Sequence, residues 1–302
     1  MSDSEYEEDG TEAFIVERTM IRRGGRAFSC DYASSAYDNL FSMVCNGAAQ
    51  LLVTCIGRIR RNQLEGQLGM VDFGDGLGVQ AVTALHNIVQ RWGHTPTHTI
   101  CTFSGRRFNE SFLVDFPDLR VPARKIKPLE ITVNGTSISW EYGLDIARGQ
   151  FGTAEHSKPP ASSSENYHVF RAVPLEYQYS AGTQVAMTVF TKQMATIQSA
   201  RMPSDVNVNL VDVYGAADEL SVYTGEITHV GQHFFAHNIN SYRGCSGAVI
   251  FLINGEYAGR CIGVHIGSPP EIEPSVNLAI NIHEAPVFVG SPEDTNFDGR
   301  KP

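Results

Sequence analysis

The sequence contains no run of about 18 consecutive apolar residues, the length that a membrane-spanning helix requires, so we expect no membrane segment. The N-terminus is acidic and lacks the apolar core of a secretory signal, which predicts a cytoplasmic protein rather than a secreted one. None of the six cysteines belongs to a C-x-x-C pair, the spacing typical of zinc and redox sites. We therefore expect reduced thiols and no bound metal or cofactor.

Basic charge is also scarce, because 23 Lys and Arg stand against 33 Asp and Glu in 302 residues. Residues 1–12 contain no Lys or Arg and carry −6 of the net charge of −10. Such an acidic, weakly apolar segment is predicted to be a disordered tail. The rest of the chain is not basic enough to suggest nucleic acid as a partner. The apolar content of 42% is sufficient for a sizeable core.

Helical periodicity is weak, and short segments rich in Val, Ile, Thr and Phe dominate instead. Asn134-Gly135 and Asn254-Gly255 separate such segments and predict two tight hairpins, the second returning through residues 256–258. Further strands are predicted at 51–59, 78–84 and 185–190, and short helices at 38–44 and after His86. Many short strands with frequent turns indicate an all-β sandwich or barrel.

One polar segment rich in Pro and Ser, residues 157–166, divides the chain and is predicted to be a linker. The expected units are a tail at 1–12, an extension at 13–39, a first β unit at 40–156, a second at 167–290 and a C-terminal tail at 291–302.

The segment Gly244-Cys-Ser-Gly-Ala248 is a candidate nucleophile loop centred on Ser246. A serine hydroxyl attacks only when a base takes its proton and backbone N–H groups stabilise the oxyanion. A glycine two residues before the serine allows that turn, and one after it is expected to leave room for substrate. The adjacent Cys245 is an alternative nucleophile, which we disfavour because the residue two before it is Arg243 rather than glycine.

A candidate base is His86, which ends an apolar strand in the run Thr83-Ala-Leu-His86. A general base needs a carboxylate on its second ring nitrogen to fix its tautomer. Two aspartates compete for this role. Asp145 follows a predicted hairpin and precedes small Ala147, which favours it, whereas Asp118 lies nearer to His86 in the chain.

These motifs together resemble the chymotrypsin-like serine peptidases, in which Thr-Ala-x-His and Asp-Ile-Ala sequences carry the base and the acid. The resemblance spans residues 40–290 in the order His, Asp, Ser, whereas α/β-hydrolases run Ser, Asp, His. It implies two antiparallel β-barrels with the active site between them. It also implies a triad of His86, Asp145 and Ser246, and an oxyanion hole at Gly244, Cys245 and Ser246 in which the Gly244 and Ser246 N–H groups donate.

The specificity motif is Gly263-Val-His265-Ile-Gly267, which resembles a strand of viral 3C-like and glutamyl endopeptidases. In those enzymes this strand and a Ser or Thr five residues before the nucleophile, here Ser241, line the specificity pocket. The resemblance therefore implies Ser241, Gly263 and His265 as substrate-binding residues. It also implies cleavage after Glu or Gln in a polypeptide substrate, and maturation of a viral polyprotein in the host cytoplasm as the role.

Departures from the secreted branch of the family are informative. Secreted enzymes have an Ile-Val-Gly-Gly start freed by cleavage, an Asp before the serine to receive it, and a Cys after the histidine. Cys245 and Asn87 occupy the latter two positions here. The oxyanion loop must therefore be held in another way.

Other readings of the sequence stay open. The alternatives to this enzyme are a catalytically silent binding or scaffold module with the same barrels, and an intracellular quality-control peptidase. His229, His233 and His237 recur every four residues, but lack an H-E-x-x-H signature for zinc and instead are candidates to support His265. Residues 74–78 resemble a phosphate loop without its Lys-Ser/Thr, and we expect them only to bend the chain. The oligomeric state is not indicated.

Overall fold

The computed structural model describes ten parts of the chain, and it shows β-strands in all of them. These parts are residues 27–29, 48–55, 63–88, 96–105, 108–116, 126–151, 169–190, 220–242, 244–272 and 275–286. Two short 3-10 helices, η2 (Leu85–Asn87) and η5 (Ile282–Glu284), interrupt the strands. In these parts no helix is long and apolar enough to cross a membrane. The predicted tails, the linker, the helix at 38–44 and Asp118 lie outside the described residues.

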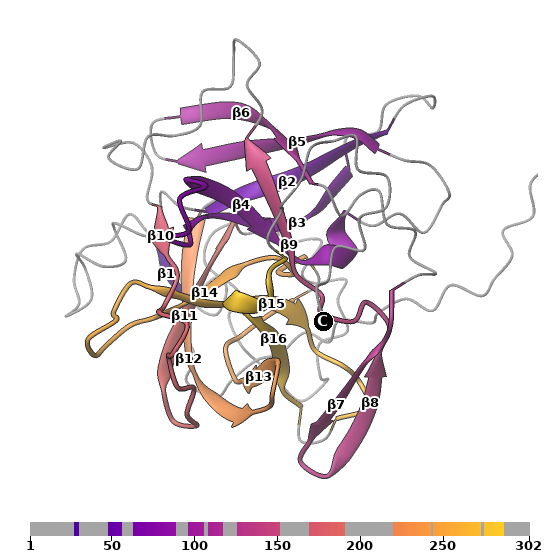
Figure 1. Cartoon of the computed structure of the whole chain (residues 1–302), viewed down its shortest axis with the longest axis vertical. Helices are drawn as coiled ribbons and strands as arrows, with labels where there is room; N and C mark the ends of the chain where they lie inside the picture. Colours follow the sequence, from indigo (N-terminus) through magenta and orange to yellow (C-terminus); the bar gives the residue numbers. More distant parts are fainter. Residues whose placement is uncertain are drawn as a thin grey trace, which may run out of the picture.

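Six strands of the N-terminal half form a closed antiparallel barrel, drawn in purple and magenta in Figure 1. Its strand order is β3-β2-β5-β6-β9-β4, and β4 also pairs with β3, which closes the ring. Closure leaves no unpaired sheet edge within the barrel. The strands are β2 (Ala48–Cys55), β3 (Gln63–Asp72), β4 (Val79–Thr83), β5 (Pro96–Gly105), β6 (Phe108–Asp115) and β9 (Ala147–Phe151).

Six strands of the C-terminal half form a second antiparallel barrel, in salmon pink, orange and yellow beside the first (Figure 1). The order is β12-β11-β14-β15-β16-β13, closed by pairing of β12 with β13, and β1 (Ala27–Ser29) adds to β12. The strands are β11 (Gln184–Phe190), β12 (Leu220–Val230), β13 (Phe234–His237), β14 (Val249–Leu252), β15 (Cys261–Gly267) and β16 (Asn277–Asn281). The predicted all-β, chymotrypsin-like two-barrel fold is thus confirmed.

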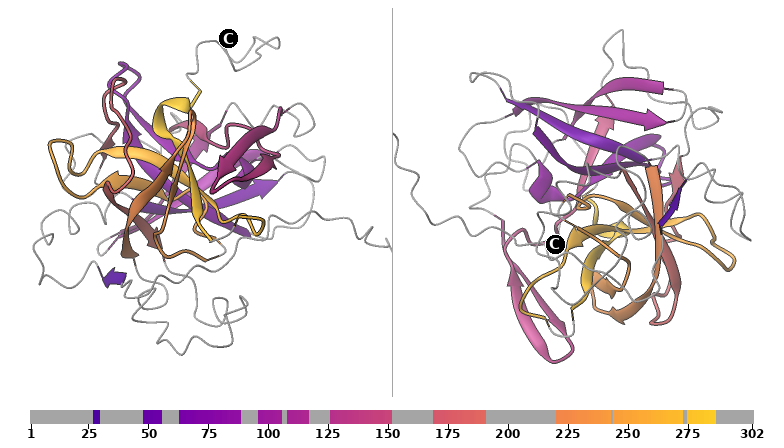
Figure 2. Two further views of the ribbon diagram at one scale, coloured as in Figure 1. Left: turned by 90° about the horizontal axis from the view of Figure 1, so that it is seen from below. Right: turned by 180° about the vertical axis from the view of Figure 1, so that it is seen from behind.

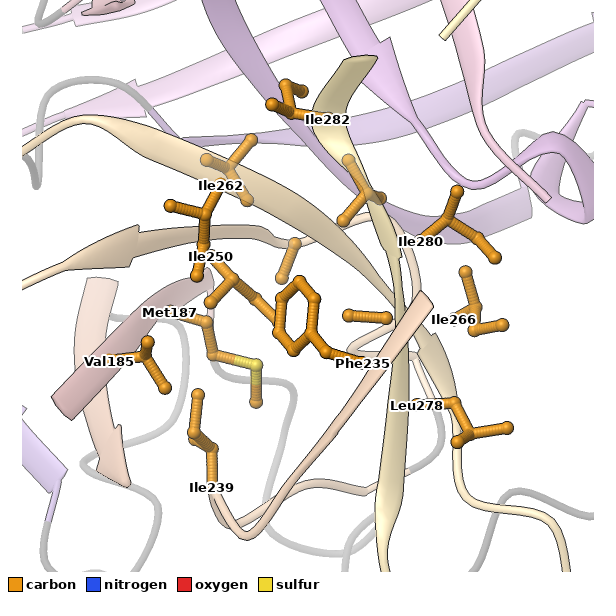
Figure 3. Packing of buried hydrophobic residues seen from close by; sticks show 14 of the residues in the cluster. Val185, Met187, Phe235, Ile239, Ile250, Ile262, Ile266, Leu278, Ile280 and Ile282 are labelled. Carbon is orange, nitrogen blue, oxygen red and sulfur yellow. The ribbon is translucent and has the colours of Figure 1, made fainter. Parts of the chain in front are cut away.

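The core of the second barrel explains why its strands are nearly continuous apolar runs. Every residue of β14, β15 and β16 is buried. Figure 3 shows aliphatic side chains from these strands and from β11 gathered around Phe235 of β13. Strands buried on both faces lose the alternation of polar and apolar residues that marks a half-exposed sheet.

The segment that enters the second barrel contacts both barrels. Strand β10 (Phe170–Arg171) lies parallel to the end of β3, although the sequence assigns it to the second unit. The next residues turn to the other barrel, where Ala172 forms a bridge with Cys261 of β15. Residues 170–172 therefore connect the sheets of the two barrels directly.

The two predicted hairpins have different outcomes. Strands β7 (Leu129–Val133) and β8 (Thr136–Trp140) form the first, with positive φ angles of 53° at Asn134 and 80° at Gly135. This hairpin is a separate two-stranded sheet that projects from the barrels (Figure 2).

The second hairpin prediction is wrong in its return strand. Residues 256–258 form a turn, and the strand that pairs with β14 begins at Cys261. The Gly259 N–H donates to the Leu252 carbonyl at 2.7 Å, so the loop spans residues 253–258 and is four residues longer than a two-residue turn. Strands β2, β4 and β11 correspond to the strands predicted at 51–59, 78–84 and 185–190, respectively.

Candidate active site

His86 lies at the end of β4, in the single turn η2 that follows the strand. Strand β4 is buried from Gln80 to Thr83, and Ala84 is still extended, so the chain leaves the barrel wall just before the histidine. The His86 side chain is 16% exposed. This position leaves one edge of the imidazole accessible while the other faces the interior.

Asp145 lies two residues before the start of β9 and is completely buried. One of its carboxylate oxygens accepts the His86 backbone N–H at 2.9 Å, and the other lies 2.7 Å from His86 Nδ1. An ionised carboxylate can only accept hydrogen bonds, so Nδ1 must carry the proton of a neutral imidazole. His86 Nε2 is then unprotonated and able to accept a proton.

Trp140 and Tyr142 complete the surroundings of this pair, and the sequence analysis did not identify either one. The Trp140 indole N–H donates to Asp145 Oδ2 at 2.9 Å, which adds a third hydrogen bond to the buried carboxylate. The Tyr142 ring lies against the His86 ring, with 5.4 Å between centroids. A Trp five residues before the favoured aspartate was the available signal, since a buried indole needs an acceptor.

The serine loop turns sharply at two glycines. Gly244 has a φ of 105° and Gly247 a φ of 91°, values that residues with a Cβ rarely adopt. The Cys245 N–H donates to the Tyr242 carbonyl at 3.0 Å, which closes the turn between them. Ser246 is 5% exposed, and its Oγ lies 3.5 Å from the Ile266 carbonyl, a long and weak hydrogen bond.

Cys245, the alternative nucleophile, is packed in the hydrophobic core. Its side chain is completely buried in the hydrophobic core, and its Sγ accepts the Tyr242 N–H at 3.4 Å. Cys245 and Cys261 are both buried, and neither forms a disulfide.

The serine loop of the second barrel is joined to the histidine turn of the first. The Ser246 carbonyl accepts from the Gln67 N–H at 2.8 Å and from Asn87 Nδ2 at 2.9 Å. Asn87 directly follows His86, so the serine and the histidine are brought to the same junction between the barrels.

Glycines at this junction serve close packing. A Cβ on Gly66 would lie 2.4 Å from Asn87 Nδ2, and one on Gly247 would lie 2.1 Å from the Gln67 carbonyl oxygen. Sequence reasoning assigned the space at Gly247 to substrate. The structure places the first barrel there instead.

The predicted specificity residues lie on or beside β15. The His265 carbonyl accepts the Gly247 N–H at 2.8 Å, and the His265 N–H donates to the Ala248 carbonyl at 2.9 Å. These two bonds place β15 next to the serine loop. Gly263 lies two residues earlier, where a Cβ would meet Phe235 and the Ile280 carbonyl at 2.6 Å. Close packing inside the barrel therefore accounts for this glycine.

Ser241 is completely buried and its proton has a defined direction. Asn277 Nδ2 donates to the Ile239 carbonyl, which turns Asn277 Oδ1 toward the serine. Ser241 Oγ lies 2.8 Å from this oxygen and must donate to it. A hydroxyl that donates one hydrogen bond can also accept hydrogen bonds through its lone pairs.

His265 is paired with His237 of β13, and both side chains are completely buried. The Ile239 N–H donates to His237 Nδ1 at 3.3 Å, so the proton of a neutral His237 lies on Nε2. His237 Nε2 is 3.2 Å from His265 Nδ1 and donates to it. His265 therefore carries its own proton on Nε2, as a donor. One of the three repeated histidines does contact His265, as the sequence suggested.

The other two repeated histidines lie elsewhere. His229 stacks on Phe234 with 6.2 Å between centroids, and His233 Nδ1 lies 2.9 Å from a carboxylate oxygen of Glu284. Across the described ranges no cluster of three metal-ligating side chains is found. The three histidines thus have three different partners.

The glycine-rich segment 74–78 bends the chain from β3 into β4, as expected. Gly74, Gly76 and Gly78 all have positive φ angles. Asp72 and Asp75 accept backbone N–H groups within the loop, at 2.9 and 3.1 Å. The loop therefore satisfies its own backbone groups.

No protein-family profile matches the sequence, and no curated protein matches it. Among solved structures, the chain is similar to a serine endoprotease from Yersinia pestis, with a TM-score of 0.46 and 12% sequence identity. The similarity covers 83% of this chain but only 64% of that one, less than two thirds of its length.

Proposed function

We propose that this protein is a serine endopeptidase in which Ser246 is the nucleophile, His86 the general base and Asp145 the group that orients it. The observation that carries the proposal is the contact between Asp145 and His86 Nδ1 at 2.7 Å. It leaves Nε2 unprotonated in the neutral ring, as a base requires. The hydrogen bond from Asn87, the next residue, to the Ser246 carbonyl supports the pairing of this base with this serine.

The reaction follows from these groups. His86 Nε2 takes the Ser246 proton while Oγ attacks the peptide carbonyl, and buried Asp145 stabilises the imidazolium that forms. The N–H groups of Gly244 and Ser246 are proposed to bind the oxyanion, because the Cys245 N–H already donates to Tyr242. His86 then returns the proton to the leaving amine. Water deprotonated by His86 hydrolyses the acyl-enzyme and regenerates the serine.

For specificity we propose Gln before the cleaved bond in preference to Glu. His265 offers an N–H donor on Nε2 and Ser241 offers an acceptor oxygen, given their partners His237 and Asn277. A carboxamide carries both an acceptor oxygen and a donor NH₂ group, so it matches both groups. A carboxylate has no donor for Ser241 and meets no positive charge when His265 is neutral.

A fluorophosphonate probe tests the nucleophile. We expect the native chain to be labelled at Ser246, Ser246→Ala to lose all labelling, and Cys245→Ala to retain it. Asp145→Asn should slow labelling by about 10⁴-fold, because an amide can donate to the histidine and select the wrong tautomer. Labelling that persists in Ser246→Ala would refute the assignment. A native chain that is never labelled would favour a silent two-barrel binding module.

Matched peptides test the pocket. We expect kcat/KM for a Gln peptide to exceed that for its Glu counterpart by about tenfold at pH 7.5, the value of one mismatched hydrogen bond. Equal rates for the two peptides, or a Glu preference, would refute the proposed donor and acceptor pair.

The biological role is a further proposal. The sequence resemblance to viral 3C-like enzymes supports maturation of a polyprotein in the host cytoplasm. Mixing the native chain with precursors that carry Gln-containing junctions would test it. Cleavage at those junctions is expected from the native chain and not from Ser246→Ala.

A further inference from the structure

We propose that Gln67 and Asn87 are positioning residues through which the first barrel holds the serine loop in its catalytic shape, without any cleavage of the N-terminus. This inference rests on the proposed peptidase function. It concerns a different question, namely what keeps the oxyanion loop formed.

Gln67 contacts the serine loop on both sides of Cys245. Its backbone N–H donates to the Ser246 carbonyl at 2.8 Å, and its Nε2 donates to the Gly244 carbonyl at 3.1 Å. A peptide unit is planar, so fixing these carbonyls fixes the peptide planes that follow Gly244 and Ser246. The peptide between them, which carries the Ser246 N–H, is then confined from both ends.

Gln67 is itself held in place through its backbone. Gln67 is completely buried, and its backbone carbonyl accepts a hydrogen bond from the Thr83 hydroxyl at 2.7 Å. The absent Cβ of Gly247 allows that carbonyl to approach the loop closely. A buried amide with this geometry has little freedom to release its partners.

Asn87 provides the second support. Its Nδ2 donates to the Ser246 carbonyl at 2.9 Å and to Thr83 Oγ1 at 3.0 Å, so both amide protons have acceptors. Because Asn87 follows His86 in the turn η2, one turn positions the base and restrains the nucleophile loop. Gly66 leaves the space that the amide occupies.

The position before the serine supports the same conclusion. A cleaved N-terminal amine needs a buried carboxylate to receive it, but this position holds Cys245, whose Sγ accepts the Tyr242 N–H. The loop is therefore held by docking of the two barrels rather than by a new N-terminus.

The test compares variants that keep side-chain shape but remove the donors. We expect Gln67→Met and Asn87→Leu each to lower kcat and the fluorophosphonate labelling rate by about 10- to 100-fold, with KM changed less than threefold. Gln184→Met is the matched control, because Gln184 Nε2 donates to Glu226 in the second barrel, away from the loop. The control should label at the native rate.

Thermal unfolding separates this role from a structural one. The inference is overturned if Gln67→Met and Asn87→Leu are both folded and label within twofold of the native rate. It is also overturned if the control Gln184→Met loses as much of its labelling rate as they do. Should either variant not fold, Thr83→Val takes its place under the same criterion. This substitution removes the hydroxyl that accepts from Asn87 Nδ2 and donates to the Gln67 backbone carbonyl.

A second arm concerns processing. The chain with its N-terminus intact should label at Ser246 as fast as an N-terminally trimmed sample. Labelling only after trimming would overturn the inference and leave the peptidase function standing. Absence of labelling in both samples would instead refute the peptidase function itself.

Discussion

His237 illustrates how a single buried side chain can govern a neighbour. It has no exposed surface, and burial lowers its pKa well below the usual value, with a further lowering from the nearby His265. The imidazole is therefore neutral in the folded protein at pH 7. Its neutrality allows it to accept from Ile239 and to donate to His265 at the same time.

We expect this histidine to make the protein less stable in acid. In the unfolded chain His237 binds a proton as the pH falls below about 6.5, whereas in the folded chain its lowered pKa prevents this. The contribution of neutral His237 to the free energy of unfolding is therefore present above that pH. It is lost toward pH 5, by up to about 1.4 kcal/mol per pH unit.

Urea unfolding at pH 5, 6 and 7 would measure the effect. His237→Asn should flatten the pH dependence of the free energy of unfolding relative to the native chain. His229→Asn is a control, because His229 is partly exposed and stacks on Phe234. Equal slopes for the native chain and His237→Asn would contradict the prediction.

At the level of elements, Arg148 joins β9 to the glycine-rich loop and to β4. It is 3% exposed, donates to Gln80 and Asp75, and lies 3.7 Å from the centre of the Phe73 ring. Desolvation raises the pKa of Asp75, but the hydrogen bonds from Arg148 and from the Leu77 N–H, together with the charge of Arg148, outweigh it and lower that pKa overall. The loop before the histidine strand is thus anchored by one cation.

Removal of this cation should destabilise the first barrel. Arg148→Met removes the guanidinium donor from buried Gln80 and from Asp75, so we expect a loss of about 2–4 kcal/mol in the free energy of unfolding. Arg171→Met, at an exposed position of β10, should change it by less than about 0.5 kcal/mol. Chemical denaturation would measure both, and similar losses would contradict the proposed anchor.

On the scale of the whole molecule, the two barrels are connected by more than the serine loop. Ala172 N–H donates to Asp72 of the first barrel and Val173 N–H to Cys261 of the second, both at 3.0 Å. His283 Nε2 lies 2.6 Å from the Val173 carbonyl and is held as a donor to it. The main hydrophobic cluster also includes residues of both barrels.

These connections predict that the barrels unfold together. Differential scanning calorimetry should show one transition, with calorimetric and van't Hoff enthalpies that agree. Val173→Pro removes the N–H that donates to Cys261 and should lower the free energy of unfolding by about 1–3 kcal/mol. Two separate transitions in the native chain would contradict the prediction.

Local features of this protein could be predicted from the sequence because their causes are local. The Asn134-Gly135 turn follows from the φ angles that these residues tolerate, and the all-β class follows from short β-branched segments. The serine and histidine motifs also mark backbone turns that their own glycines and small residues permit. At the second Asn-Gly the same reasoning was wrong, because Gly259 offered a competing turn.

The site depended on contacts that no local pattern contains. Asp145 and His86 are 59 positions apart, and Gln67 and Gly244 are 177 apart. A hydrogen bond across such a separation depends on the strand register and on the docking of two closed sheets. The sequence alone therefore determined which residue types were available for the site. Only the tertiary structure decided that Trp140, Gln67, Asn87 and His237 support it.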